Sequence, residues 1–160
     1  MYNPSHSNYY WSFIKQEIYM LTPESIQSLA EVWYRKLDVH APMVEVLPML
    51  ADEGLEMVFP EATVYGYAGF EGWFQRVIRI FFDEVHTVKS TEAVINGDTA
   101  VVKVVVKWEA SVWNAPDAYS KRITLDAYQT WDVKVGPNGS PIITRYTVDD
   151  LKYYEGSATL

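Results

Sequence analysis

The sequence contains no cysteine, which excludes disulfide bonds and thiolate metal sites. Runs of basic residues are also absent, and the net charge of -8 would repel a polyphosphate, so nucleic acid is not an expected partner. No apolar stretch is long enough to span a bilayer, and the N-terminus lacks the basic start and apolar run of a signal peptide. These absences predict a cytoplasmic protein that binds neither nucleic acid nor a membrane.

Aromatic residues, in contrast, are abundant: the chain of 160 residues has 6 Trp, 12 Tyr and 6 Phe. In a chain of one-domain size, so many rings fill a bulky core, cover a subunit interface or line a cavity. We expect one domain over residues 22–155, preceded by an N-terminal extension over 1–21 and followed by a C-terminal tail over 156–160. A helix over 9–20 is one interpretation of the aromatic cluster in the extension.

Three helical segments are predicted in the first half of the chain. The first has Thr22 as its N-cap, followed by proline, and should end near Asp38. The second, over about 42–51, contains Pro48, which predicts a kink or two separate turns. The third has its apolar residues at helical spacing, which predicts one buried stripe made of Phe70, Trp73, Phe74, Val77 and Phe81.

The hydrophobic period changes to two from about residue 84, which predicts β-strands. Two short strands, near 55–59 and 63–65, precede the third helix. Turn signals at 96–98 and 136–141 then divide the second half into long strands, expected at about 84–95, 99–113, 120–135 and 142–150. Helices followed by a run of antiparallel strands indicate an α+β fold, a curved antiparallel sheet wrapped around the N-terminal helices.

The hairpin turn predicts which way the first two long strands face. If residues 96–98 form a three-residue loop, His86 lies opposite Trp108, and opposed residues share one face of a sheet. The pairs on that face are mostly apolar and include Ser90 and Val94, whereas the other face is mostly polar. His86 is therefore predicted to point toward the helices. Alternation in the next strand places on the inner face Ile123, Leu125, Ala127, Gln129 and Trp131.

The order of these features resembles the nuclear transport factor 2-like superfamily, the cystatin-like cone shared by ketosteroid isomerase, scytalone dehydratase and small polyketide cyclases. The resemblance covers roughly residues 22–150. It depends on Leu37-Asp38 ending the first helix, the run from Leu50 to Pro60, Gly69-Phe70 opening the third helix, His86, and the run from Asn96 to Ala100. The resemblance implies a cone with an apolar pocket, and a homodimer, expected here through the outer face of the sheet.

The catalytic residues of these relatives match this sequence only in part. In scytalone dehydratase, an Asp that ends the first helix and a His in the first long strand serve the reaction, and Asp38 and His86 lie at similar places. The general base of ketosteroid isomerase would fall near Phe59, and the second catalytic His of scytalone dehydratase near Trp108. The resemblance therefore implies a fold and a pocket but does not select a reaction.

Two classes of function follow. The first is an enzyme without a cofactor that moves a proton on a small apolar cyclic or aromatic molecule, by isomerisation, dehydration or cyclisation. His86 would be its acid–base residue, Asp38 would orient His86 or act as a second base, and Gln129 or a Tyr hydroxyl would polarise the substrate.

The second class is a non-catalytic ligand-binding or dimeric assembly domain. Three scattered histidines without cysteine predict no metal site in either class. In both classes the residues expected to line the pocket are Trp33, Tyr65, Trp73, Trp108, Gln129, Trp131 and Tyr146.

Overall fold

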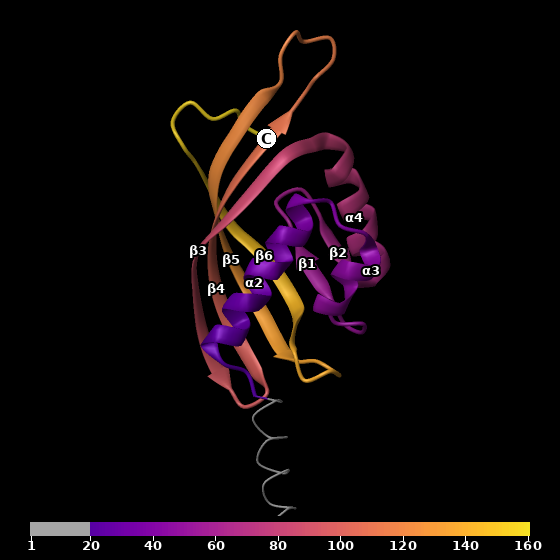
Figure 1. Ribbon diagram of the computed structural model, residues 1–160, viewed down its shortest axis with the longest axis vertical. Coiled ribbons are helices and arrows are strands. Elements are labelled where there is room, and N and C mark those ends of the chain that lie inside the picture. Colours follow the sequence, from indigo (N-terminus) through magenta and orange to yellow (C-terminus); the bar gives the residue numbers. More distant parts are fainter. Residues whose placement is uncertain (1–19) are drawn as a thin grey trace, which may run out of the picture.

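The computed structural model describes residues 20–160, and the helix considered over 9–20 lies, apart from Met20, outside this range (Figure 1). Its helices are α2 (Pro23–Asp38), α3 (Met43–Val46), the short 3-10 helix η1 (Leu47–Met49) and α4 (Gly66–Ile80). No helix among these residues is long and apolar enough to cross a membrane.

The N-terminus of α2 is held by a reciprocal pair of hydrogen bonds. The Thr22 hydroxyl accepts from the backbone N–H of Ser25, and the Ser25 hydroxyl accepts from the N–H of Thr22, both at 3.0 Å. This capping box satisfies two backbone donors that have no partner inside the helix. The break expected at Pro48 is confirmed, because the segment divides into α3 and η1.

The six strands form one open, mixed sheet in the order β2-β1-β6-β5-β4-β3. The strands are β1 (Glu56–Val58), β2 (Thr63–Tyr65), β3 (Phe81–Asn96), β4 (Thr99–Val112), β5 (Lys121–Val135) and β6 (Pro141–Tyr153). The α+β fold and its curved sheet are confirmed, and Figure 1 shows the long strands curving around α2.

One strand pair departs from the expected antiparallel sheet. Strand β1 runs parallel to β6, with Met57 opposite Tyr146. The chain already lies parallel to β6 before β1 begins, because Leu50 forms a parallel bridge with Ile143. The short strands β1 and β2, which pair with each other antiparallel, therefore extend the sheet at its β6 edge, and the pair of β1 with β6 is parallel.

The loop between β3 and β4 is shorter than the sequence predicted. Asn96 pairs with Thr99, so the turn contains only Gly97 and Asp98. Gly97 has a φ of 64°, a left-handed conformation that two-residue hairpins require and that glycine adopts without strain. The prediction of a three-residue loop is therefore wrong by one residue.

A β-bulge between Val88 and Ser90 compensates for the shorter loop, because it adds one residue to β3. As a result His86 lies opposite Trp108, the pairing that the sequence predicted. Between the bulge and the turn the predicted faces are reversed: Ser90 and Val94 were expected to point inward, but both are exposed, and Val94 is 75% exposed.

A second bulge lies between Phe82 and Val85 and contains Asp83, whose φ is 49°. Phe81, before this bulge, packs against the core, and Glu84, which lies in the bulge next to Asp83, is also buried. From this bulge to the one after Val88 runs a short segment of β3 whose even-numbered residues point to the inside of the sheet. That segment carries Glu84 and His86.

The core is built mainly by α2, α4 and the concave face of the sheet. In α4, Phe70 and Phe74 are fully buried, and the Phe70 ring lies 5.6 Å from that of Trp33 in α2. Trp73, expected on the same buried stripe, is only half-buried. The helix begins at Gly66, earlier than Gly69, because a φ of 67° at Gly66 turns the chain directly from β2 into α4.

Candidate active site

A cavity of about 490 Å³ lies between α4 and the concave face of the sheet. Its walls come from α4, from one end of β3, and from the inner residues of β4, β5 and β6. Most of the lining side chains are apolar, and the stacked rings of Phe59 and Trp73, 3.8 Å apart and nearly parallel, form part of the wall. The polar lining residues include Glu84, His86 and Gln129.

Four of the predicted pocket residues line this cavity: Trp73, Trp108, Gln129 and Tyr146. Trp33 and Trp131 do not. They are fully buried behind Tyr146, with ring centroids 5.9 Å and 5.2 Å from its ring, and they form the core that supports the wall.

Tyr65 is misplaced by the prediction, because it is 67% exposed. It is the last residue of β2, the edge strand of the sheet, where Val64 is the residue that packs against the core. Strand alternation therefore directs the Tyr65 side chain away from the interior.

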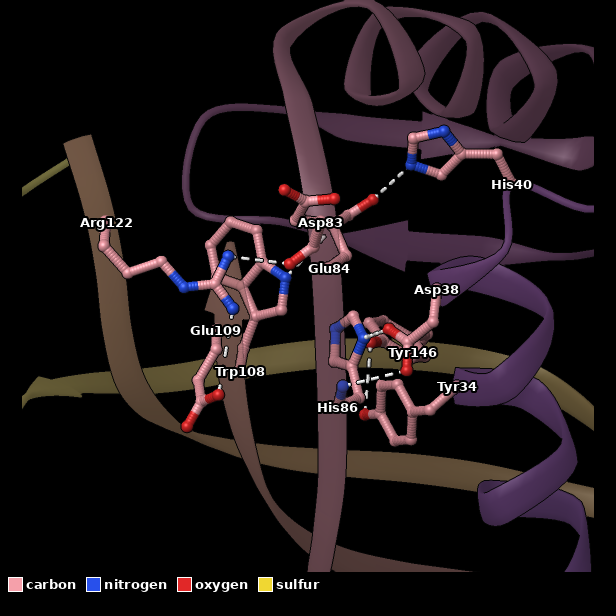
Figure 2. A network of polar contacts seen from close by, with 10 residues as sticks. All are labelled: Tyr34, Asp38, His40, Asp83, Glu84, His86, Trp108, Glu109, Arg122 and Tyr146. Carbon is pink, nitrogen blue, oxygen red and sulfur yellow. Dashed lines mark hydrogen bonds and ion pairs between the residues drawn. The ribbon is translucent and has the colours of Figure 1, made fainter. Parts of the chain in front are cut away.

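His86 and Asp38 are in direct contact, as Figure 2 shows. Asp38 is the last residue of α2, and His86 lies on the inner face of β3 between the two bulges. One carboxylate oxygen, Oδ1, lies 2.5 Å from His86 Nδ1, and the other, Oδ2, accepts the backbone N–H of His86 at 2.9 Å. Only 11% of the His86 side chain and 19% of the Asp38 side chain are exposed.

This geometry determines which ring nitrogen of neutral His86 carries the proton. A carboxylate can only accept hydrogen bonds, so Nδ1 must be the donor to Asp38. In the neutral ring Nε2 then has a free lone pair, and it forms no hydrogen bond to another group of residues 20–160. The imidazole ring stacks with Tyr34, at 4.6 Å between ring centroids, and with Trp108, at 6.1 Å. His86 thus brings an unprotonated ring nitrogen to a cavity wall.

Gln129 is the centre of a buried polar cluster. Its Oε1 accepts the Tyr34 hydroxyl at 2.8 Å and the Trp131 indole N–H at 2.9 Å. An indole nitrogen is only a donor, so this contact sets the orientation of the amide and leaves the Gln129 NH₂ group to donate elsewhere. Gln129 lines the cavity, and its NH₂ group, which has two N–H bonds, also interacts with Tyr146.

The two tyrosines of this cluster stay neutral. Burial, followed by the neighbouring Tyr146, raises the pKa of Tyr34 well above its usual value, and burial also raises the pKa of Tyr146. Their hydroxyl oxygens lie 3.4 Å apart. Since Tyr34 donates its proton to Gln129, the hydroxyl of Tyr146 is the donor in the contact between the two phenols.

A second acid–base pair, which the sequence analysis missed, joins Glu84 to His40. Glu84 Oε2 lies 2.5 Å from His40 Nε2, and Oε1 accepts the Trp108 indole N–H at 3.2 Å. The Glu84 side chain is only 3% exposed. A signal was available: Glu84 precedes His86 by two residues in a strand, so it should share the inner face, where a carboxyl group needs a partner.

A second, more open hollow, called the outer depression below, adjoins the cavity, and Glu84 lines both. Asp38, His40, Glu84, Ser111 and Arg122 line it, and Figure 2 shows these acid–base pairs and Arg122 around β3. Arg122 donates to the backbone carbonyl of Asp83 at 2.7 Å and to the Ser111 hydroxyl at 3.0 Å. Within residues 20–160, no group of three or more His, Cys, Asp or Glu side chains is arranged to hold a metal ion.

No protein family model and no curated protein matches the sequence. Solved structures do match the fold. A proposed aromatic ring hydroxylase from Novosphingobium aromaticivorans superimposes with a TM-score of 0.71 at 18% identity, over 82% of this chain and 92% of that chain. For a hexachlorocyclohexane dehydrochlorinase, LinA-type3 from Novosphingobium barchaimii, the TM-score is 0.67 at 14% identity, over 86% and 92% of the two chains.

A third structure, a proposed dehydratase of the NTF2-like family from Streptomyces avermitilis, has a TM-score of 0.65 at 12% identity, over 79% of this chain and 96% of that chain. At such low identity, these similarities establish the fold alone. The chain therefore shares the cystatin-like fold of these structures, which is the fold that the resemblance in the sequence implied.

Proposed function

We propose that the protein is an enzyme that moves a proton on a small apolar molecule, cyclic or aromatic, bound in the cavity. The observation that carries this proposal is the orientation of His86. Its Nδ1 is bound to Asp38 at 2.5 Å, so its unprotonated Nε2 is left for a molecule in the cavity. An imidazole titrates closer to neutral pH than any other side chain, which suits it to general acid–base catalysis.

The chemical step follows from the contacts of His86. Nε2 takes a proton from a carbon of the substrate, and the ring becomes an imidazolium ion. The Asp38 carboxylate stabilises that positive charge, because it already lies against Nδ1. Negative charge develops on an oxygen or on a leaving group of the substrate, and the Gln129 amide N–H is the donor available to meet it.

The cavity wall indicates the kind of substrate. The stacked pair of Phe59 and Trp73 and the indole of Trp108 offer flat apolar surfaces, against which a ring packs better than a chain or a charged group. Two of the proteins with the same fold are a dehydrochlorinase and a proposed dehydratase. Both names describe eliminations, which require a base that removes a proton from the substrate.

The proposal can be tested without knowing the natural substrate, by using 5-nitro-1,2-benzisoxazole as a probe. This flat aromatic compound needs one base: removal of its C3 proton breaks the N–O bond and releases a coloured nitrophenolate. We expect the protein to accelerate this elimination, and His86→Gln to lower kcat by about 10²–10⁴-fold, the usual contribution of a general base, while the dissociation constant of the probe is kept.

The change to glutamine removes the base but keeps a polar side chain of moderate size at the wall. Equal turnover by His86→Gln and the wild-type protein would contradict the proposal. So would tight binding of the probe in the cavity without any acceleration, a result that would favour the non-catalytic binding domain.

A further inference from the structure

We infer that Glu84 is a second acid–base residue of the same cavity, and that His40 connects Glu84 to solvent. The inference deepens the proposed function and rests on it, since Glu84 would act on the molecule that His86 deprotonates. It also narrows the substrate to a cyclic carbonyl compound with a C–H group beside the carbonyl. Conversion of such a molecule to its enol requires a base at the carbon and an acid at the carbonyl oxygen.

Two acid–base pairs cross the same wall in opposite directions. The wall is formed by the end of α2 and by the segment of β3 between the two bulges. In one pair the carboxylate, Asp38, lies on the outer depression and the imidazole, His86, lines the cavity. In the other pair the imidazole, His40, lines the outer depression, and the carboxyl group, Glu84, lies between the two hollows and lines both the depression and the cavity. The cavity therefore receives one imidazole and one carboxyl group from adjacent inner positions of a single strand.

The backbone around Glu84 is arranged to turn this side chain inward. Asp83 is in the left-handed region with a φ of 49°, which is uncommon for a residue other than glycine, and its carbonyl is held by Arg122 at 2.7 Å. This bulge brings Glu84 to the face that also carries His86. Two residues along a strand place the two side chains about 6–7 Å apart. That spacing leaves room for a C–H group at one residue and the adjacent carbonyl oxygen at the other.

The contacts of Glu84 stabilise the state that remains after proton donation. In the donating state the proton is on Oε1, which still accepts the Trp108 N–H through its other lone pair. After donation Glu84 is a carboxylate that accepts two N–H groups, one from Trp108 at 3.2 Å and one from His40 at 2.5 Å. His40 is 25% exposed at the outer depression, so it can take up a proton from water and pass it to Oε2. A half-turn of the carboxyl group about its Cγ–Cδ bond then brings the protonated oxygen to the position of Oε1.

The complete step is balanced. The substrate C–H bond breaks as its proton moves to His86 Nε2, and the electron pair of that bond becomes the C=C bond of an enol. The Glu84 Oε1–H bond breaks as its proton moves to the carbonyl oxygen. His86 is left as an imidazolium ion paired with Asp38, and Glu84 is left as a carboxylate. The reverse transfers, after exchange of the His86 proton with solvent, return the ketone with a new hydrogen at carbon.

Two probes separate the role of Glu84 from that of His86. Exchange of the C1 hydrogens of 2-tetralone in heavy water, followed by proton NMR, requires the base at carbon and benefits from an acid at oxygen. Elimination of 5-nitro-1,2-benzisoxazole requires only the base, because its nitrophenolate leaves without a proton. We expect Glu84→Gln to lower the exchange rate at least about tenfold more than the elimination rate, since a positioned acid contributes 10²–10⁴-fold. The amide keeps an oxygen for the Trp108 N–H, places its NH₂ group against His40, and has no acidic proton to transfer to the substrate.

The matched control is Glu45→Gln, the same substitution at an exposed carboxylate that pairs with Lys36 on the surface. It should change neither rate. Equal losses of both rates in Glu84→Gln, or no loss of either, would overturn the inference and would leave Glu84 as a structural contact between β3 and the segment that follows α2. If Glu84→Gln does not fold, His40→Gln replaces it, with the same selective loss of exchange expected and equal losses again overturning the inference.

The two rates of the wild-type protein, elimination and exchange, distinguish this inference from the proposed function. Elimination without measurable exchange of 2-tetralone would overturn the role of Glu84 and leave His86 as a base. Absence of both reactions would overturn the proposed function, and the inference with it.

Discussion

Replacing Asp38 by asparagine should reverse the tautomer of His86. The carboxylate accepts two N–H groups of the same residue, the backbone N–H and Nδ1–H. Asparagine has one acceptor oxygen and one NH₂ group, so it can accept only one of the two donors. The backbone N–H cannot change its role, but the ring can, by moving its proton from Nδ1 to Nε2. In Asp38→Asn the nitrogen that faces the cavity is therefore protonated and cannot act as a base.

Asp38→Asn should lower both the elimination rate and the free energy of unfolding, because it removes the free base and one hydrogen bond to a carboxylate. Losing a base in the correct protonation state should lower the elimination rate of 5-nitro-1,2-benzisoxazole by about 10²–10⁴-fold. Hydrogen bonds to a charged group each contribute about 1.5–3 kcal/mol, so the free energy of unfolding should fall by an amount in that range. The protein should stay folded, because the apolar core of α2 does not include Asp38.

The assay has two readouts on the same protein. Nitrogen-15 NMR of imidazole-labelled protein, with the His86 signals assigned by comparison with His86→Gln, should show a protonated Nδ1 in the wild type and a protonated Nε2 in Asp38→Asn. The matched control is Asp126→Asn, which changes a carboxylate on the outer face that binds Lys89 and Tyr154. It should leave the elimination rate and the His86 signals unchanged. An Asp38→Asn protein with the wild-type tautomer and the wild-type rate would refute this reasoning.

Two further predictions concern stability and assembly. Phe70→Ala should lower the free energy of unfolding by about 3–5 kcal/mol, because the ring is fully buried against Trp33. Phe82→Ala, on the surface, should lower it much less. Equal losses of the two variants in chemical denaturation would show that the core is misplaced. We also expect a homodimer through the outer face of the sheet, where Val85 and Val101 are exposed, with a light-scattering mass of about twice 18.4 kDa. Val101→Lys should then give the monomer mass, and a monomeric wild type would contradict the interface.

Much of the fold could be predicted from local chemistry. The cap at Thr22, the proline that divides the second helical segment, and the change of hydrophobic period near residue 84 each depend on near neighbours in the chain, and the structure agrees with them. The parallel pairing of β1 with β6 could not be predicted in the same way. It joins segments about 90 residues apart in sequence, and no turn connects them directly.

The contact between His86 and Asp38 was predicted partly because two errors cancelled. The loop is one residue shorter than expected, and the bulge after Val88 restores the register at His86. Bulges are set by the twist and packing of a whole strand, so alternation alone could not place them. The same limit explains why Ser90 and Val94 were assigned to the wrong face.

The second pair was missed because its partners have no common sequence pattern. Alternation places Glu84 on the inner face with His86, but the orientation of His40 depends on an uncommon backbone conformation, a φ of 50° in the break after α2. Trp33 and Trp131 were expected in the pocket and lie in the core instead. An inward-facing ring can fill either place, and sequence alternation does not distinguish the two.

The most direct test of the central claim is a crystal structure of the protein with 2-naphthol, a flat aromatic compound with one hydroxyl group. If His86 presents an unprotonated nitrogen to the cavity, the naphthol ring should lie between the apolar walls, with its hydroxyl oxygen about 2.6–3.2 Å from His86 Nε2, the reach of a general base. A naphthol bound in the cavity with its hydroxyl group directed away from His86, or an Nε2 buried against protein atoms in the complex, would contradict the account.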